Sequence, residues 1–463
     1  ILTAKKKKLH VQIGDAIEEI HKDDLNDHCE ALAGHYITGE NYEKGAEYSK
    51  LAERKAEKAG SLTDAIAYAE KRIACLERLP RTEEIEKGII SARTTLGLYC
   101  MQMNYYVEAK EAVDLIVELA LERDYRRRVS QIYIILGGYS WGVEENFSMA
   151  FKYLEEALEI AEELNDIVSL VMARYQKGTF IANSCEFEEG LHYLEKALEI
   201  NVAANSLWGI SQIKSGIVIS VYCIQGKIDL AYQTGKEALR MAEESGDTAS
   251  KAWAYIALGL SCYYKRSFDE AEEYTLQGAG LCERINLFSV WSMALFILGA
   301  TYFDRGEYIR SQEHHERAIS VLQRSRIMPS FTNLNKIALA RAKVMSGAKD
   351  INLNEIFRYY EDNKLKVYEG ILLRLIGEIL VNIDDEHMNE AEDRIKRAIE
   401  ANKRNGTMWE LGMAHASYAQ LLRRKGDLSS AKEHLNTAIG IFKECGADGW
   451  VKMYEEELAG ISA

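Results

Sequence analysis

Small residues recur along this chain at nearly constant intervals, and this regularity restricts its fold more than any other feature of the sequence. The first series has glycine or alanine at intervals of 37 to 43 residues: Gly97, Gly137, Gly178, Gly216, Gly259, Gly299, Ala340, Gly377 and Ala419. The second series keeps the same spacing, with one position skipped: Ala109, Ala150, Gly190, Ala231, Ala271, Ser311, Ala391 and Ala431. Small side chains let two helices approach closely, and a period in this range is typical of repeat arrays. The two series therefore predict tandem helical hairpins, with one series on each helix.

The expected turns follow the same spacing. Glycines fall between the two helices of a hairpin, where a positive φ ends the first helix: Gly39, Gly226, Gly306 and Gly426. Residues that tolerate the left-handed conformation fall between successive hairpins: Asn165, Asn205, Gly246, Asn286, Gly406 and Gly446. The chain contains only 2 prolines, which favours long helices with short connections.

The first series resembles the tetratricopeptide signature, because leucine precedes the glycine at Gly97, Gly137, Gly259 and Gly299. The step Leu298-Gly299 is also followed by Tyr302, as in the Leu-Gly-x-x-Tyr pattern of that repeat. We therefore predict an all-α, tetratricopeptide-like α-solenoid, a right-handed superhelix of about ten long hairpins. The period is near 40 rather than about 34 residues, and the proline that commonly closes the standard repeat is missing. Each helix should be about one turn longer than in the standard repeat.

Four segments are expected. Residues 1–80 hold junction helices and irregular first repeats, and residues 81–328 hold the regular array. Residues 329–365 form a degenerate repeat, because Gly347-Ala348-Lys349-Asp350 interrupts the alanine series. Residues 366–463 hold two further repeats and a C-terminal capping helix.

The front segment resembles a junction in large bacterial signalling ATPases. The resemblance lies in Lys7-Lys8-Leu9-His10, Ala16-Ile17-Glu18 and Leu32-Ala33-Gly34-His35-Tyr36, with lysine where arginine is commoner before the Leu-His step. In that family a class III nucleotide cyclase domain, or another output domain, precedes a P-loop ATPase module, and a long tetratricopeptide tail follows. The resemblance implies that this chain is a non-catalytic sensory or scaffolding tail of an adenylate or guanylate cyclase. LuxR-type transcription activators carry a similar tail, and a free-standing oligomerisation scaffold is a further alternative.

Composition excludes several partners and compartments. The net charge of −15 argues against nucleic acid, because phosphate binding needs clustered lysine and arginine. No apolar run approaches the ~18 residues that would span a membrane. The 8 cysteines occur singly, as in a reduced compartment, with four on apolar helical stripes: Cys29, Cys100, Cys223 and Cys262. No signal-peptide pattern follows Ile1, so we expect a cytoplasmic chain that belongs to a longer protein. Two basic runs, Lys5–Lys8 and Arg126–Arg128, are interpreted as solvated helix faces or, alternatively, as docking patches.

Catalytic motifs are missing from the sequence. It has no Gly-x-x-x-x-Gly-Lys-Ser/Thr loop, so any ATP binding would belong to a parent protein, and no nucleophile elbow or His-Glu-x-x-His helix. The pair His314-His315 consists of adjacent residues that point in different directions around a helix, so we expect surface histidines and no metal site. We predict no catalytic residue and no cofactor.

Binding is instead expected along the first helices, which line the groove of such arrays. Counting from each small residue gives an apolar, aromatic set of candidate binding residues: Trp141, Tyr175, Ile213, Trp253, Tyr263, Phe296 and Phe303. The equivalent positions further on are polar: Arg374, Glu378, Gln420 and Arg423. This pattern suits a protein or amphipathic peptide, or a small hydrophobic ligand. Self-association is a further partner hypothesis, and burial of these positions between the long helices is the structural alternative.

Overall fold

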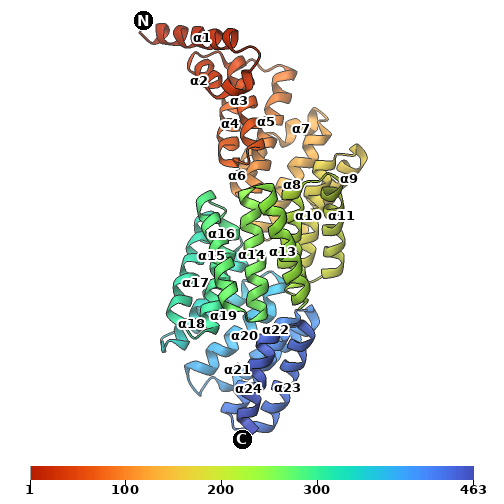
Figure 1. The fold of residues 1–463 in the computed structure, drawn as a ribbon, viewed down its shortest axis with the longest axis vertical. Helices are drawn as coiled ribbons and strands as arrows, with labels where there is room; N and C mark the ends of the chain where they lie inside the picture. The colour runs from red at the N-terminus through yellow and green to blue at the C-terminus, as the bar shows by residue number, and fades with distance from the viewer. Residues whose placement is uncertain (1, 463) are drawn as a thin grey trace. The chain divides into compact units, whose positions relative to one another are not determined.

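The computed structural model describes residues 2–462, and these residues fold into successive helices with no strand among them (Figure 1). Contacts divide the chain into two units, residues 1–173 and residues 174–463, and the boundary falls inside helix α10. Each unit is described by itself below. The four segments expected from the sequence remain a prediction about finer organisation.

Unit 1 begins with irregular helices and continues as hairpins. Its elements are α1 (Leu2–Ile20), the 3₁₀ helix η1 (Leu25–His28), α2 (Cys29–Thr38), α3 (Tyr42–Lys58), α4 (Leu62–Leu76), α5 (Glu83–Gln102), α6 (Tyr106–Asp114), α7 (Val117–Glu122), α8 (Arg126–Gly142), α9 (Phe147–Leu164) and the start of α10 (Ile167–Asn183).

Unit 2 repeats the hairpin through to the C-terminal helix. Its elements after α10 are α11 (Phe187–Ala203), α12 (Leu207–Ile217), the π-helical η2 (Val218–Tyr222), α13 (Ile228–Ser245), α14 (Thr248–Lys265), α15 (Phe268–Ile285), α16 (Phe288–Asp304), α17 (Tyr308–Ser325), α18 (Pro329–Met345), α19 (Leu353–Glu361), α20 (Lys366–Ile383), α21 (Met388–Asn405), α22 (Met408–Arg424), α23 (Leu428–Cys445) and α24 (Asp448–Ser462).

The two series of small residues lie on alternate helices and face each other, as predicted. We call the helices that carry the first series the first helices: α5, α8, α10, α12, α14, α16, α18, α20 and α22. A Cβ on Gly377 of α20 would lie 2.4 Å from Ile395 Cγ1 and 3.3 Å from the carbonyl oxygen of Ala391 on α21. At Gly178 and Gly190 a Cβ on either residue would come within 2.8 Å of the other's carbonyl oxygen. The two paired helices can approach this closely because the glycines at the contact have no side chain.

The turns confirm the predicted left-handed positions with one exception. Gly226, Gly306 and Gly426 have φ of 77°, 81° and 84°, and Asn286 between hairpins has φ of 56°. Gly39 is the exception, because its φ is −79° and the following Glu40 adopts the positive φ of 61°. A Cβ on Gly39 would lie 2.6 Å from Val11 Cγ2 of α1. Glycine is needed there for the close approach of α1, so the assignment of Gly39 as a left-handed turn residue was wrong.

Packing between the helices is apolar and close. The alanines of the second series are fully buried, as are those two turns further along the same helices, for example Ala231 and Ala238. Cys29, Cys100, Cys223 and Cys262 are free and buried, which confirms their assignment to the apolar stripes. Where the series is interrupted after α18, the second helix α19 has only nine residues.

Candidate functional site

Unit 2 contains a cavity of about 50 Å³ that is built mainly by first helices. We call it the unit 2 cavity. Apart from His315 of α17, its lining comes from α14, α16, α18, α20 and α22: Leu260, Tyr263, Tyr264, Phe296, Ile297, Ala300, Phe303, Ala338, Arg341, Ile371, Arg374, Leu375, Trp409 and Glu410. Most of these residues recur at spacings of three, four or seven along their helices, so they share one helix face.

A compensated ion network forms one side of this cavity. The Arg374 guanidinium donates to both oxygens of Glu410, at 2.9 and 3.1 Å, and to Glu378 Oε1 at 2.9 Å. Arg341 forms an ion pair with the other oxygen of Glu378, and the Ser417 hydroxyl donates to Glu378 at 2.5 Å. Arg374 is only 3% exposed. Two arginines and two glutamates thus neutralise each other in a position where an unpaired charge would be strongly destabilising.

The network keeps Arg374 and Glu378 ionised. Burial alone would lower the pKa of Arg374, but Glu410 and Glu378 outweigh it and hold that pKa well above its ordinary value. Burial acts to raise the pKa of Glu378, but Arg341 and Arg374 hold it below its ordinary value. Asp304 differs, because burial raises its pKa despite the nearby Arg341. Asp304 accepts a hydrogen bond of 2.9 Å from the Tyr263 hydroxyl.

Aromatic rings form the other side. The Arg341 guanidinium lies over the Phe303 ring, 3.5 Å from its centroid. Trp409 contacts Tyr264 edge-on with centroids 4.5 Å apart, and Tyr263 at 5.7 Å. These contacts desolvate both the rings and the arginines, which strengthens their electrostatic interactions.

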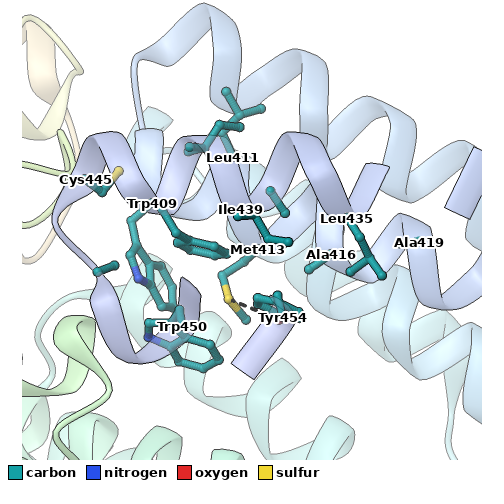
Figure 2. Packing of buried hydrophobic residues seen from close by; sticks show 14 of the residues in the cluster. Trp409, Leu411, Met413, Ala416, Ala419, Leu435, Ile439, Cys445, Trp450 and Tyr454 are labelled. Carbon is teal, nitrogen blue, oxygen red and sulfur yellow. Dashed lines mark hydrogen bonds between the residues drawn. The ribbon is translucent and has the colours of Figure 1, made fainter. Parts of the chain in front are cut away.

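The C-terminal helices hold Trp409 in place (Figure 2). Trp409 packs against Trp450 of α24, with ring centroids 5.6 Å apart. It also packs against Phe442 of α23, with centroids 6.2 Å apart. Trp450 in turn contacts Phe268 of α15, and a Cβ on Gly449 would lie 2.6 Å from the carbonyl oxygen of Lys265 at the end of α14. The last helices of unit 2 therefore dock on the α14–α15 turn, beside Trp409 of the cavity lining.

The structure brings together three of the seven candidate binding residues. Tyr263, Phe296 and Phe303 line the unit 2 cavity. Ile213 is buried between helices, and Tyr175 packs over Gly216, whose Cβ would lie 3.0 Å from the ring.

The other two candidates also take part in helix packing. Trp253 packs against the buried cluster around Ile256, and Trp141 of unit 1 contacts Phe147 with centroids 4.3 Å apart. A binding role for any of the seven remains a prediction.

Two expectations about polar residues need correction. The polar positions were counted among those that line the groove, but Arg374 is buried in the ion network and Glu378 is half-buried there, whereas Gln420 and Arg423 are exposed. His315 was expected at the surface, but it is buried over Gly299, whose Cβ would lie 2.7 Å from His315 Nε2. Burial lowers the pKa of His315 to about 4, although Asn335 at 3.1 Å opposes this shift. Gly299 on the facing helix makes room for the imidazole. The position of this glycine in the first series could therefore have indicated that His315 is buried.

Sequence reasoning missed Arg341, Trp409 and Glu410. Arg341 directly follows Ala340 of the first series, at the position that Glu378 occupies after Gly377. This equivalence could have identified Arg341, but the interrupted repeat obscured it. Trp409 and Glu410 lie near the start of α22, well before Ala419 of the first series, so counting from that alanine did not reach them.

The described residues contain no group of three or more histidine, cysteine or acidic side chains that could hold a metal ion. None of the helices between residues 2 and 462 combines the length and apolar character needed to cross a membrane. The unit 2 cavity offers aromatic and aliphatic surface beside charges that already have partners. This chemistry suits recognition of an apolar group.

No protein-family model matches the sequence, and no curated protein sequence matches it. Solved structures do match. A Rap protein complexed with Competence and Sporulation Factor aligns with a TM-score of 0.50 and 17% identity, over 84% of this chain and 99% of that chain. The fold is a tetratricopeptide-like α-solenoid.

Two further solved structures are similar at lower scores. A STAND protein with a tetratricopeptide repeat sensor from Pyrococcus horikoshii aligns with a TM-score of 0.46 and 16% identity, over 81% of this chain. The present chain spans 55% of that protein's length. The apo quorum sensor NprR from B. thuringiensis aligns with a TM-score of 0.47 and 12% identity, over 76% of this chain and 98% of that chain.

Proposed function

We propose that this chain is a non-catalytic interaction module that binds a protein or peptide partner on the first-helix face of unit 2. The unit 2 cavity would take one apolar side chain of that partner. The observation that carries this proposal is the convergence of α14, α16, α18, α20 and α22 on a single aromatic cavity. Desolvated aromatic pockets of this kind commonly anchor a partner's apolar side chain.

The charges around the cavity support an apolar occupant. Arg374 and Arg341 are engaged by Glu378 and Glu410, so a ligand carboxylate would have to displace a formed ion pair. Desolvating such a network for a polar ligand gains little. The part of the cavity lining that is not engaged in these ion pairs consists of aromatic rings and aliphatic side chains.

The size of the cavity favours a side chain over a whole small molecule. One water molecule needs a cavity volume of about 10–15 Å³, whereas small-molecule sites usually have volumes of about 300–1,000 Å³. A cavity of about 50 Å³ is far below that range. A partner side chain could enter it while the rest of the partner lies along the helices.

A cavity-filling substitution tests this proposal. Ala300 of α16 lines the cavity, so Ala300→Leu should occupy the space that an anchor side chain needs. Peptides selected from a displayed random library on the wild-type chain should bind Ala300→Leu at least about tenfold more weakly. Calorimetry on the purified variants would measure this loss.

The matched control is Ala203→Leu, which adds the same atoms to an exposed position on α11. It should bind the selected peptides like the wild type. Selection of no peptide, or equal binding to both leucine variants, would contradict the proposal.

We further propose that this module is the regulatory tail of a signalling ATPase–nucleotide cyclase. The residues that carry this resemblance meet in unit 1. His10 Nδ1 of α1 lies 3.0 Å from His35 Nδ1 of α2, and Glu18 of α1 accepts hydrogen bonds of 2.6 Å from Lys44 and Tyr48 of α3. A helix docked through such contacts could transmit a displacement between the repeats and a preceding domain.

The reading frame upstream of Ile1 tests this assignment. A P-loop preceded by a cyclase domain would support it. A DNA-binding LuxR-type protein, or a frame that begins at Ile1, would contradict it. A free-standing scaffold would instead show concentration-dependent self-association of the isolated chain by light scattering.

A further inference from the structure

Unit 1 contains a second cavity, of about 270 Å³, with a different lining. We call it the unit 1 cavity. Its walls come from α3, α4, α5, α8 and the unit 1 part of α10. Four cationic side chains, Lys50, Arg54, Arg72 and Arg128, face it together with two carboxylates, Glu53 and Glu57. This excess of positive charge contrasts with the net charge of −15 of the whole chain.

One cation and one carboxylate of this lining neutralise each other. Arg72 Nη1 lies 3.1 Å from Glu53 Oε2, and the two residues are 6% and 2% exposed. Burial raises the pKa of Glu53 even though Arg72 opposes this shift. Glu57 lies beside the buried Tyr99 hydroxyl and contributes, after burial, to the raised pKa of that phenol. Glu53 also acts electrostatically on Lys50 and Arg54, but the lining still holds four cations against two carboxylates.

Arg128 is held in position by neutral groups. Its Nη1 donates to Gln131 Oε1 at 2.7 Å and its Nη2 to Ser91 Oγ at 2.6 Å, while its Nε is buried without a hydrogen-bond partner. This finding corrects the expectation that the basic run 126–128 forms a solvated face. Arg126 and Arg127 do lie exposed in ion pairs with Glu163 and Asp166, but Arg128 turns into the cavity.

Lys50 and Arg54 are, like Arg128, cations of the lining whose charge is not paired with a carboxylate. Among residues 2–462, no ion pair joins Lys50, Arg54 or Arg128 to a carboxylate. Burial, followed by the charges of Arg72 and Arg54, lowers the pKa of Lys50. Positive charges held together and partly desolvated raise the free energy of the empty site, and an anion would relieve this cost.

We propose that the unit 1 cavity binds a carboxylate of an acidic segment of a protein partner. Arginine and lysine provide charge-assisted hydrogen bonds to carboxylates, and Leu98 and Met172 of the same lining provide apolar surface for neighbouring side chains. The acidic character of the chain as a whole favours a protein segment over nucleic acid as the ligand. This site shares no lining residue with the unit 2 cavity, because its residues all belong to unit 1.

Binding of a defined probe tests the assignment. The probe is a short end-blocked peptide of alternating leucine and glutamate, and its counterpart has glutamine in place of glutamate. The wild-type chain should bind the glutamate peptide, more weakly as salt is raised, and should not bind the glutamine peptide. Lys50→Gln and Arg128→Gln should each weaken binding by about tenfold or more.

The matched control is Lys152→Gln, which removes the same charge from an exposed position on the second helix α9. It should leave the affinity unchanged, apart from a small long-range effect. Within residues 2–462, Lys50 makes no hydrogen bond that Lys50→Gln would lose, so this variant remains informative even if Arg128→Gln unfolds. Thermal melting of each variant establishes that it is folded.

Two results would overturn the proposal. The first is equal binding of the glutamate peptide to Lys50→Gln and to the wild type, or no binding to either. The second is binding of inorganic phosphate that is lost in Lys50→Gln while the peptide does not bind, which would assign the site to a phosphate ligand. Ala300→Leu in unit 2 should not change peptide binding here, so failure of this proposal is distinguishable from failure of the proposed function.

Discussion

The two cavities lie on helices of one repeat type, yet they differ in how their charges are balanced. In unit 2, Arg341, Arg374, Glu378 and Glu410 satisfy one another, and the remaining surface is aromatic. In unit 1, Arg72 and Glu53 form an ion pair, but the three further cations of the lining form none among the described residues. The residues that line each cavity, rather than the helical fold that the two units share, decide whether an apolar group or an anion is recognised.

The largest expected effect comes from breaking the network of unit 2. Arg374→Met should destabilise unit 2 by about 3–5 kcal/mol, because it leaves Glu410 without its partner and weakens the pairing of Glu378. Five of the six tryptophans lie in unit 2, so urea unfolding followed by tryptophan fluorescence would measure this loss. Arg404→Met, at the exposed pair with Glu369, should cost less than about 1 kcal/mol. Equal effects of the two substitutions would contradict the account of the network.

Acid should weaken unit 2 through His315. The pKa of His315 is about 4 in the folded chain and about 6.5 when the residue is exposed, so the unfolded chain binds a proton first as the pH falls. Stability is therefore present above about pH 6.5 and is lost as the pH falls toward 4, by about 2 kcal/mol between pH 7 and pH 5. Unfolding free energies at these two values should show a smaller loss in His315→Gln than in the wild type. His192→Gln, at an exposed position, should retain the wild-type loss.

Adding a methyl group should have opposite effects on stability at a glycine between paired helices and at a glycine on the surface. Gly377→Ala places a Cβ 2.4 Å from Ile395 and should cost about 1–3 kcal/mol through overpacking. Gly440→Ala, on the open surface of α23, has no atom within 4 Å of the new Cβ and should stabilise by about 0.5–1 kcal/mol. Thermal melting of the two variants should give shifts of opposite sign. Destabilisation by both would show that the series of small residues does not set the helix spacing.

The smallest effect on stability is expected from a substitution in the unit 1 cavity. Lys50→Gln removes a cation that lies among other cations, so it should change the stability by less than about 0.5 kcal/mol in either direction. Chemical unfolding would measure this difference. A loss of stability comparable to that of Arg374→Met would mean that Lys50 stabilises the fold through a structural partner and is not free to bind a ligand.

Much of the fold could be predicted from spacing alone. The two series of small residues identified every first and second helix that carries them, because close helix packing at these points excludes larger side chains. Gly39 was misassigned because a glycine needed for close approach and a glycine needed for positive φ look the same in a sequence. The nine-residue α19 lies where the alanine series is interrupted.

The sites could be predicted only in part. Counting along each helix placed Tyr263, Phe296 and Phe303 at one cavity, since helix periodicity is local. The pairing of Arg374 with Glu410 joins residues 36 positions apart, and the wall at Trp409 depends on docking of α24. The unit 1 cavity was missed because its cations come from α3, α4 and α8, and only Arg128 belonged to a basic run.

The most direct test of the central claim is a paired binding measurement on one chain. The selected apolar peptide and the glutamate peptide would each be titrated into the wild type, Ala300→Leu and Lys50→Gln. We predict that Ala300→Leu loses the apolar peptide and keeps the glutamate peptide, and that Lys50→Gln does the reverse. Loss of both peptides in either variant, or of neither in both, would contradict two chemically distinct sites on one repeat scaffold.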